Sequence, residues 1–423
     1  MKKYLPRVYD QVLKDRLSSK GAILVEGPKW CGKTTTSVHA SNSVVYLQDP
    51  KKREQYNQMI QLDPSKILKG DTPLLIDEWQ ESVELWDAIR FEVDKRRKFA
   101  QFILTGSSVP AHIEKARHSG TGRIARLRMQ PMALFESGES SGEVSLKALF
   151  DSNDFIYAES NTDLEGIAFS LCRGGWPASV GASEKAALRQ AYDYIDALTE
   201  IDISRVDGVR RNADTAKMLL RSYARMTASQ ASYKTILNDL KETDISLSDS
   251  TLAQYIESLQ RLFVIEDLKA WNPNLRSKTA IRTSNTRHFV DPSIAAAALG
   301  ANPSALLSDL KTFGLLFENL CIRDLRTYAL GIDGEVRHFR DKYGLECDAV
   351  VCLRDGRYGL IEIKLGGKSL IDEGSKTLKK LSEKIDTEKM KQPSFLMVLT
   401  ANDSISYIRE DGVCVVPIGV LGP

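Results

Sequence analysis

The sequence predicts an α/β protein that begins with a nucleotide-binding P-loop region built on a parallel sheet and continues through a winged-helix element into a second α/β region. Three observations lead to this prediction. Short apolar runs in the first half are separated by segments of helical length, as in parallel sheets covered on both faces. A glycine-rich motif follows the first of these runs, and the pattern of expected helices and strands changes near residues 200 and 300.

The composition is that of a folded protein with several domains. The chain has 423 residues, of which 42% are hydrophobic and 27% charged, and this length suits roughly two to four domains. The formal net charge of +2 excludes a polycation, so nucleic-acid contact has to come from a local patch. No apolar run approaches the length of a membrane span, and the 6 cysteines include no C-x-x-C pair. These features predict a cytoplasmic protein without a membrane partner.

Three regions follow from the pattern of the elements. The strands of the first sheet are expected at 22–25, 44–47, 74–76 and 102–104. Between about 155 and 199 the pattern turns helical, and we assign this stretch to the first domain as an extension. The predicted domains are a P-loop domain at 1–200, a winged-helix domain at 201–300 and a second α/β domain at 301–423.

A phosphate-binding loop follows the first predicted strand. Residues 27–34, GPKWCGKT, fit the pattern G-x-x-x-x-G-K-[ST] and precede a predicted helix, which is the context that the motif requires. Backbone N–H groups of such a loop surround phosphates at a helix N-terminus. Lys33 is expected to reach the β- and γ-phosphates of ATP, and the Thr34 hydroxyl to bind Mg²⁺. The predicted nucleotide-binding residues are Gly27, Pro28, Trp30, Cys31, Gly32, Lys33, Thr34, Thr35, Asp77 and Thr105.

Two carboxylates end the third predicted strand. Asp77 is expected to anchor Mg²⁺ together with Thr34, and Glu78 to orient the attacking water. Thr105, after the next strand, is either a sensor of the γ-phosphate or an ordinary strand-end cap. Arg123 is the favoured donor of positive charge to the transition state, and if it acts from a second copy it requires a homo-oligomer. The competing arginines are Arg7, Arg117, Arg126, Arg128 and Arg173.

The second region has the pattern of a helix-turn-helix with a wing, a fold that often binds DNA. Apolar residues recur at helical spacing between Leu252 and Phe263. The polar face of this helix is nearly uncharged, whereas phosphate contacts need Lys and Arg. The preceding helix is richer in arginine, and a DNA-contacting face, a solvated face and a face docked on the P-loop domain remain alternatives.

A hairpin in the third region brings chemistry-bearing residues together. Residues 354–356, Arg-Asp-Gly, suit a three-residue loop with glycine in the left-handed position. Such a loop places Asp348 opposite Glu362, with Lys364 on the same face. A two-residue turn would instead place Asp348 opposite Ile363.

Clustered carboxylates repel one another unless a cation neutralises them. Asp348 and Glu362 are therefore predicted metal ligands, and Glu318 on the preceding helix is a third candidate carboxylate. Lys364 is expected to orient or activate water for phosphodiester hydrolysis. The alternative is a solvent-facing ion pair, in which case this region binds DNA or a protein partner without cleaving it.

The motifs together resemble a known family architecture. The segments 27–34, 74–78, 104–108, 122–123 and 131–136 resemble prokaryotic AAA+ ATPases of the AAA_14 type. The tail from about residue 200, with 317–319, 346–348, 361–364 and 411–417, looks like the domain of unknown function 4143 that is usually fused to them. Trp30 departs from this pattern, because a smaller or basic residue is more usual there. The insert at 110–121 is also atypical.

The resemblance implies a fold and a set of functional residues. It implies an AAA+ P-loop ATPase that uses ATP and Mg²⁺ as a molecular switch, a winged-helix element and a C-terminal PD-(D/E)xK nuclease-like domain. The nuclease-type positions that it implies are Glu318, Asp348, Glu362 and Lys364, and all four residues are present. DNA is the expected partner of the winged-helix and nuclease-like domains.

Overall fold

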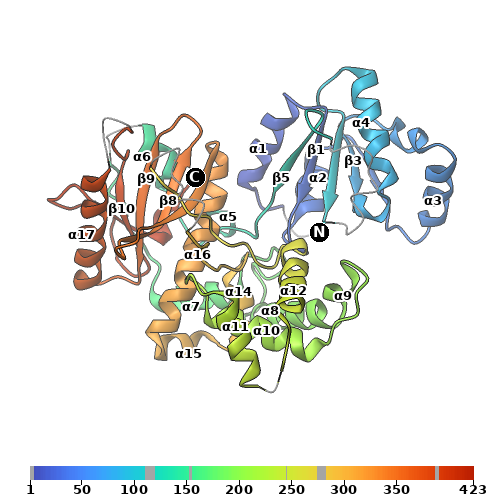
Figure 1. Ribbon diagram of the computed structural model, residues 1–423. Helices are drawn as coiled ribbons and strands as arrows, with labels where there is room; N and C mark the ends of the chain where they lie inside the picture. The colour runs from blue at the N-terminus through green and yellow to red at the C-terminus, as the bar shows by residue number, and fades with distance from the viewer. Residues whose placement is uncertain (1–3, 110–119, 152–154, 244, 274–282, 386–389) are drawn as a thin grey trace. The chain divides into compact units, whose positions relative to one another are not determined.

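The computed structural model describes residues 4–109, 120–151, 155–243, 245–273, 283–385 and 390–423 (Figure 1). The chain forms two compact units. The first unit consists of Met1–Pro131, Glu200–Arg211 and Gln254–Val264, and the second unit consists of Met132–Thr199, Asn212–Ala253 and Ile265–Pro423. This division differs from the predicted domains, because residues 132–199 join the second unit and two later segments return to the first. The insert at 110–121 lies largely outside the described residues.

A five-stranded parallel sheet forms the centre of the first unit, with strand order β2-β3-β4-β1-β5. Its strands are β1 (Ala22–Glu26), β2 (Ser43–Tyr46), β3 (Leu74–Asp77), β4 (Phe102–Gly106) and β5 (Ile124–Arg128). The four predicted strands are confirmed: the apolar runs of β1, β3 and β4 fill the buried middle of the sheet, and β2 forms one edge with half-buried residues. The edge strand β5 was not predicted, since its sequence, IARLR, is half polar and its residues are mostly half-buried or exposed.

Helices pack around this sheet. They are α1 (Val8–Leu17), α2 (Lys33–His39), α3 (Arg53–Leu62) and α4 (Glu84–Arg96). Leu24, Ile76 and Leu104 from three neighbouring strands are at most 1% exposed and share one core cluster with the helical residues Leu85 and Ile89. Burial of the strands on both faces explains why their runs are continuously apolar rather than alternating.

Two segments distant in sequence complete the first unit. One contains α9 (Ile203–Arg205), and the other contains the C-terminal part of α12 (Asp249–Arg261). Leu259 is fully buried, the Val109 N–H donates to the Arg261 carbonyl at 3.0 Å, and the Arg128 guanidinium lies 4.4 Å from the Phe263 ring centroid. The C-terminal half of the predicted DNA-reading helix is therefore packed within the first unit.

A six-stranded mixed sheet dominates the second unit, in the order β11-β12-β10-β9-β8-β7. The strands are β7 (Gly334–Arg340), β8 (Glu346–Leu353), β9 (Tyr358–Lys364), β10 (Leu396–Thr400), β11 (Tyr407–Ile408) and β12 (Cys414–Pro417). Strands β7, β8 and β9 are antiparallel, whereas β9, β10 and β12 are parallel. The helices α16 (Leu310–Gly331) and α17 (Lys368–Lys384) pack on this sheet.

The remaining helices of the second unit are α5 (Leu134–Ser137), α6 (Leu146–Asp151), α7 (Leu164–Arg173), α8 (Glu184–Ala197), α10 (Ala213–Arg225), α11 (Tyr233–Lys241), α14 (Pro292–Leu299) and α15 (Pro303–Ser308). Of these, α7, α8, α10 and α15 pack against α14 or α16, whereas α11 packs on α10, α6 on β6 (Val144–Ser145) and α5 on the turn Ile418–Val420. A two-stranded sheet pairs β6 with β13 (Leu421–Gly422). Within the described residues, no helix has both the length and the apolarity that crossing a bilayer requires.

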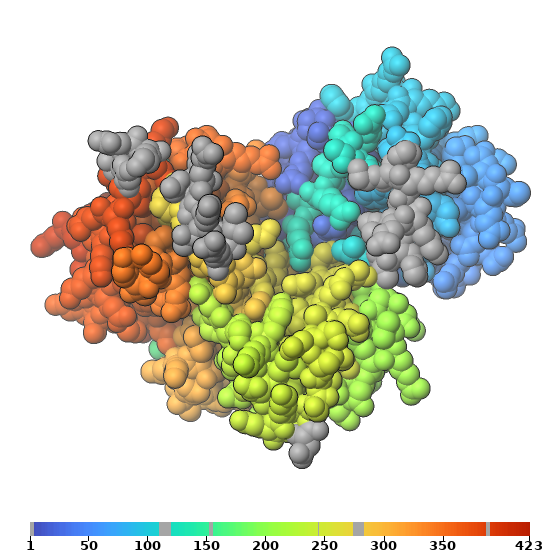
Figure 2. Space-filling view, viewed as in Figure 1, coloured from blue at the N-terminus to red at the C-terminus, as the bar shows by residue number. Residues whose placement is uncertain are grey.

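The helices α10, α11 and α12 precede two antiparallel bridges, Ile265–Phe289 and Leu268–Thr286, which is the element order predicted for a winged helix. Helices α10 and α11 contribute the yellow-green surface in Figure 2. Two basic residues of α10 are held by carboxylates: Lys217 pairs with Asp196 at 2.8 Å and Arg225 with Asp239 at 3.1 Å. These pairs favour a solvated face over a DNA-contacting one for this helix.

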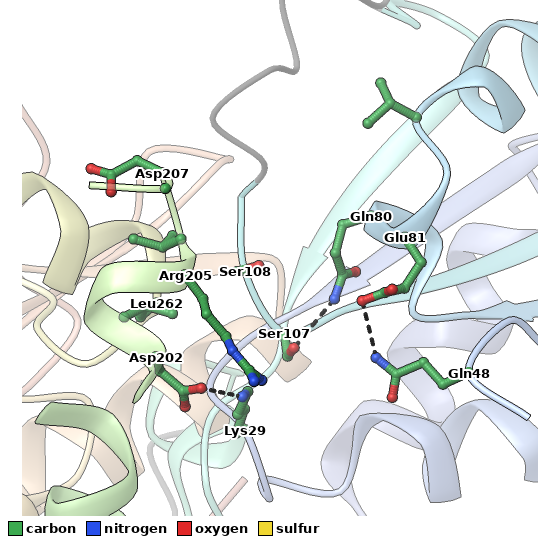
Figure 3. Close-up of a pocket in the computed structure, with 13 residues that line it drawn as sticks. Lys29, Gln48, Gln80, Glu81, Ser107, Ser108, Asp202, Arg205, Asp207 and Leu262 are labelled. Carbon is green, nitrogen blue, oxygen red and sulfur yellow. Dashed lines mark hydrogen bonds and ion pairs between the residues drawn. The ribbon is translucent and has the colours of Figure 1, made fainter. Parts of the chain in front are cut away.

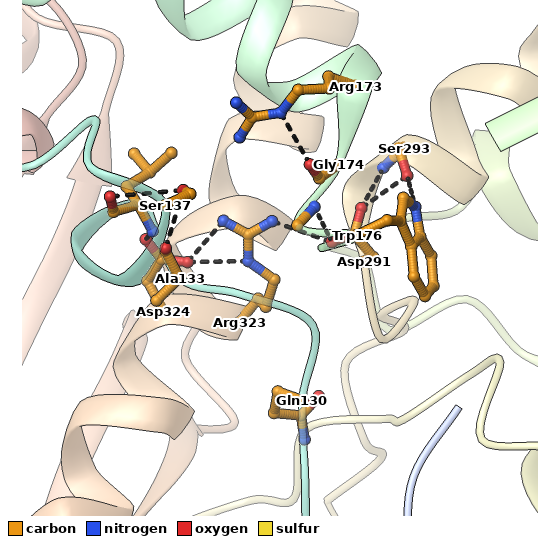
Figure 4. Close-up of polar contacts among 12 residues, drawn as sticks. Gln130, Ala133, Ser137, Arg173, Gly174, Trp176, Asp291, Ser293, Arg323 and Asp324 are labelled. Atoms are coloured by element: carbon orange, nitrogen blue, oxygen red, sulfur yellow. Dashed lines mark hydrogen bonds and ion pairs between the residues drawn. The ribbon is translucent and has the colours of Figure 1, made fainter. Parts of the chain in front are cut away.

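A buried ionic network fixes α16 inside the second unit (Figure 4). The Arg323 guanidinium, 1% exposed, donates to Asp291 at 2.9 Å and to Asp324 at 2.8 Å. Asp291 also accepts from the Gly175 N–H, and Asp324 from the Leu134 N–H, each at 2.9 Å. Burial raises the pKa of Asp324 to about 6, although Arg323 opposes this shift. The network also accounts for the end of α7 at Arg173, since the following turn, residues 174–177 (GGWP), bonds to Asp291 through the Gly175 N–H rather than continuing the helix.

Candidate active sites

The phosphate loop runs from the end of β1 to the start of α2. Gly32 caps α2 with a φ of 100°, and Trp30 also has a positive φ, of 66°. A Cβ atom on Gly27 would lie 2.2 Å from the Met129 carbonyl oxygen, so only glycine fits at this position. The loop therefore curves tightly in front of the N-terminus of α2, which is the arrangement that binds phosphate.

Two cationic side chains bond to backbone carbonyls at the phosphate loop. Lys33 is 5% exposed, and its Nζ atom donates to the Pro28 carbonyl at 2.7 Å. The Arg7 guanidinium donates to the carbonyls of Cys31 and Gln130, each at 2.9 Å. Arg7 of the preceding segment thus stabilises the loop by bonding to its backbone, whereas Lys33 belongs to the loop and bonds within it.

A chain of hydrogen bonds joins the loop to the ends of β3 and β4. The Thr34 hydroxyl donates to Asp77 Oδ1 at 2.8 Å, and the Thr105 hydroxyl donates to the same oxygen at 2.6 Å. The Glu78 N–H donates to the Thr105 hydroxyl at 3.0 Å. The predicted Mg²⁺ residues Thr34 and Asp77 therefore meet, and Thr105 positions both carboxylate-bearing residues. Hydroxyl and carboxylate oxygens are the ligands that Mg²⁺ prefers, so this set fits the ion.

Glu78 ends β3 in a left-handed conformation with a φ of 57°. Its carboxylate accepts a hydrogen bond from the Ser107 hydroxyl at 3.0 Å and a further one from the Gln80 amide. An αL conformation is uncommon in a residue other than glycine, and it turns the Glu78 side chain away from the continuation of the strand. Gln80 was not predicted, although its place two residues after Glu78 is a local signal.

In the second unit, the hairpin of β8 and β9 has the predicted register. Ala349 pairs with Ile361, and Cys352 pairs with Tyr358. The same register, continued by one residue, places Asp348 opposite Glu362. Gly356 has a φ of 87°, as the three-residue loop requires. The register prediction is therefore confirmed.

Lys364 lies between the two carboxylates of this hairpin. Its Nζ atom is 2.8 Å from Glu362 Oε2 and 3.7 Å from Asp348 Oδ2. The Ile363 N–H donates to Asp348 Oδ2 at 2.8 Å. Asp348, Glu362 and Lys364 thus form one cluster, which we call the carboxylate cluster.

Comparison with known proteins assigns the two units. Residues 19–137 match the AAA domain family AAA_14, residues 164–305 match the domain of unknown function DUF8612, and residues 313–421 match the domain of unknown function DUF4143. The chain carries an AAA_14 ATPase domain and a DUF4143 domain. The first unit thus contains a P-loop ATPase domain, and the carboxylate cluster belongs to the DUF4143 domain.

Relatives extend along most of the chain. Uncharacterized proteins Rv2008c of Mycobacterium tuberculosis and Mb2031c of Mycobacterium bovis are each 24% identical over 357 residues, covering 83% of this chain and 72% of theirs. Among solved structures, the Walker-type ATPase PABY2304 of Pyrococcus abyssi aligns with a TM-score of 0.43 at 15% identity, covering 70% of this chain and 96% of that one.

A cavity of about 460 Å³ adjoins the phosphate loop of the ATPase domain (Figure 3). Its lining includes Lys29 of the loop, Gln80 and Ser107 beside Glu78, and Arg205 of α9. Lys29 Nζ lies 2.6 Å from Asp202 Oδ1. Sequence reasoning missed Lys29, Asp202 and Arg205, because nothing local indicates that residues 200–211 return to the ATPase domain.

Arg123 lies away from the nucleotide site of its own chain. Its carbonyl accepts from the N–H of Ala22, which begins β1, whereas the phosphate loop follows the end of β1. Because the strands are parallel, Arg123 is at the opposite edge of the sheet. Its Nε atom bonds to Asp94 Oδ1 at 2.8 Å, and this bond lowers the pKa of Asp94. Arg173, another predicted alternative, is buried in the second unit and pairs with Glu139.

Burial and nearby carboxylates raise the pKa values of two glutamates of the DUF4143 domain, Glu362 and Glu318. Burial and the nearby Asp348 raise the pKa of Glu362 to about 8, although Lys364 opposes the shift. Burial, followed by Asp348, raises the pKa of Glu318 well above its ordinary value. Burial lowers the pKa of Lys364, but the two carboxylates raise it by more. The predicted third carboxylate, Glu318, is thus coupled electrostatically to the cluster.

The carboxylate cluster offers two candidate ligands for a divalent cation. Glu362 Oε1 is buried and has no hydrogen-bond partner among the residues that the structure describes, so it can accept a metal bond. In the part of the chain that the structure describes, no three His, Cys, Asp or Glu side chains are arranged to hold a metal ion. Asp348 and Glu362 therefore fit a cation as a pair, with the remaining positions left to backbone oxygens and water.

Proposed function

We propose that this protein is a Mg²⁺-dependent ATP-hydrolysing switch. The observation that supports this most directly is the hydrogen-bond chain Thr34–Asp77–Thr105 beside the phosphate loop. Bound Mg²⁺ would neutralise charge on the β- and γ-phosphates. Thr34 and Asp77 would hold the ion, and Lys33 would leave the Pro28 carbonyl to donate to the phosphates.

Glu78 is the proposed residue that orients the attacking water. Its carboxylate is held by Ser107 and Gln80 at the wall of the cavity. These two residues keep the acceptor oxygen in place, and water bound there would lie at the end of β3, where the γ-phosphate is expected. The proposed homo-oligomer would bring Arg123 of a second copy to this site.

Trp30 gives a direct test of nucleotide binding. It stands in the phosphate loop and is 49% exposed, whereas the other four tryptophans, Trp79, Trp86, Trp176 and Trp271, are at most 7% exposed. Titration with ATP and Mg²⁺ is expected to change its fluorescence, and Lys33→Ala to weaken ATP binding roughly a hundredfold. Trp30→Phe identifies the source of the signal. Equal ATP affinity in wild type and Lys33→Ala, measured by calorimetry, would contradict the proposal.

A second proposed activity is metal-dependent phosphodiester cleavage by the DUF4143 domain. It is supported by the unpartnered Glu362 Oε1 atom beside Asp348 and Lys364. A divalent cation there would polarise the phosphate, while Lys364 would donate to or position the attacking water. DNA is the proposed substrate. The alternative is that this domain binds DNA or a protein partner without cleaving it.

The hairpin itself supplies a matched control for this activity. Asp348→Asn removes a proposed ligand, whereas Asp355→Asn changes an exposed carboxylate in the loop of the same hairpin. Each variant is incubated with single- and double-stranded DNA and RNA in Mg²⁺ or Mn²⁺. We expect Asp348→Asn alone to lose cleavage. Equal cutting by wild type and Asp348→Asn would rule out this site, and absence of cutting with retained binding would favour the alternative.

A further inference from the structure

We infer that Arg205, which lies in the DUF8612 match rather than in the AAA_14 match, completes the ATP site by contacting the γ-phosphate. This inference rests on the proposed function, because it requires ATP at the phosphate loop. It gives segment 200–211 a role in sensing whether the γ-phosphate is present.

Segment 200–211 is fixed firmly in the ATPase unit. Ile203 is fully buried, and the Arg211 guanidinium donates to both oxygens of Asp207, at 2.7 and 2.6 Å, and to the Ile203 carbonyl at 2.8 Å. The Ser258 hydroxyl donates to Asp207 at 3.3 Å. The backbone that carries Arg205 is therefore held on both sides of that residue.

The same segment is tied to the phosphate loop by an ion pair. Lys29 Nζ lies 2.6 Å from Asp202 Oδ1, and the Asp202 side chain is only 13% exposed. Arg205 extends from α9 toward Lys29 and lines the cavity with it (Figure 3). The opposite wall carries Ser107 and Gln80, the two residues that hold Glu78. A phosphate beyond the loop in the direction of Glu78 would thus enter the cavity that Arg205 lines.

Each described acidic side chain that lines this cavity is bonded to another residue, and none of them pairs with Arg205. Asp202 forms an ion pair with Lys29, and Asp207 forms one with Arg211. Glu81 accepts from Gln48 at 3.2 Å on the far side. The Arg205 side chain makes no hydrogen bond or ion pair with any residue that the structure describes. A terminal phosphate is the ligand that would balance its charge, and a guanidinium can bind phosphate oxygens through two parallel bonds.

Three other arginines of this unit are bonded to groups outside the cavity. Arg7 supports the loop through the Cys31 carbonyl, and Arg126 pairs with Glu26 at 3.0 Å. Arg123 is at the opposite edge of the sheet. Because ADP lacks the γ-phosphate, Arg205 is expected to discriminate between the two nucleotides.

The test measures ATP and ADP affinity by Trp30 fluorescence and steady-state hydrolysis for wild type, Arg205→Ala, Arg205→Lys and Arg210→Ala. Arg210 is a matched control, since it is exposed in the same segment but does not line the cavity. We expect Arg205→Ala to bind ATP roughly tenfold more weakly, to bind ADP as wild type does and to hydrolyse ATP roughly a hundredfold more slowly. Arg205→Lys should recover part of the ATP affinity, and Arg210→Ala should behave as wild type.

The outcomes separate this inference from the proposed function. Unchanged ATP affinity and hydrolysis in Arg205→Ala would overturn the role of Arg205 while leaving the ATP site intact. Equal losses for ATP and ADP would also overturn it, because the effect would then not depend on the γ-phosphate. Failure of the wild-type protein to bind either nucleotide would overturn the proposed function and, with it, this inference.

Discussion

The nucleotide site and the carboxylate cluster are built on different physical principles. In the nucleotide site, Thr34, Asp77 and Thr105 bond to one another at ordinary distances, and the loop depends on glycine where the backbone is crowded. In the cluster, two carboxylates share a single lysine, and the pKa of Glu362 is raised to about 8. Backbone geometry determines which residues the nucleotide site tolerates, whereas the balance of charge determines this in the carboxylate cluster. Substitutions should therefore affect the stability of the two sites in different ways.

The largest expected effect tests the dependence of the nucleotide site on backbone geometry. Gly27→Ala would place a methyl group 2.2 Å from the Met129 carbonyl oxygen, which belongs to the backbone and cannot rotate away. We expect the ATPase unit to lose about 2 kcal/mol in free energy of unfolding, equally at pH 5 and pH 8. Chemical denaturation checks this. Gly122→Ala is the control for backbone strain, since Gly122 also has a positive φ, of 83°, but no described atom lies within 4 Å of a Cβ there; the difference between the two variants measures the clash. A clear pH dependence of the Gly27→Ala effect would weaken the comparison.

For the carboxylate cluster, in contrast, the free energy of unfolding is expected to depend on pH. The pKa of Glu362 is about 8 in the folded protein, above the ordinary value of 4.5, so the folded state keeps a proton that the unfolded chain releases. Stability should therefore fall as pH rises from about 5 to 8. Glu362→Gln should remove at least about 1.4 kcal/mol of this fall, the equivalent of one pKa unit.

Denaturation at several pH values measures this effect, and Asp355→Asn, at an exposed position in the loop of the same hairpin, serves as the control. Mn²⁺ should flatten the wild-type profile, because a bound cation favours the ionised carboxylate. A Glu362→Gln profile as steep as that of wild type would show that another group causes the loss.

The smallest expected effect concerns the hydroxyl that joins β3 and β4. Thr105→Val keeps the shape of the side chain but removes its bonds to Asp77 and to the Glu78 N–H. We expect about 1 kcal/mol less stability and a lower rate of ATP hydrolysis, with Thr105→Ser restoring both. Thermal unfolding and phosphate release measure the two quantities. An unaffected rate would indicate that Thr105 only caps the strand.

Local patterns predicted much of this architecture. The apolar runs predicted the strands at 22–25 and 102–104 because central strands of a parallel sheet are buried on both faces. The loop at 354–356 predicted that Asp348 lies opposite Glu362, since hairpin loop length fixes register. Both results depend on residues close together in the sequence.

What could not be predicted depends on distant parts of the chain. Arg123 follows a glycine near other arginines, and no local feature tells which edge of the sheet it will occupy. Arg205 enters the ATPase unit only because residues 200–211 pack there, which requires the fold as a whole. The edge strand β5 was missed because its exposed side carries arginine rather than an apolar run.

The interleaving of the two units has a consequence for synthesis on the ribosome. The ATPase unit draws its last segment from Gln254–Val264, about twice as far along the chain as the end of its sheet at Arg128. A nascent chain carrying only the sheet lacks the partners of Val109 and Arg128, namely Arg261 and Phe263. Native closure of this unit therefore waits until residue 264 has been translated, and a chain cut off after the AAA_14 match lacks part of its ATPase unit.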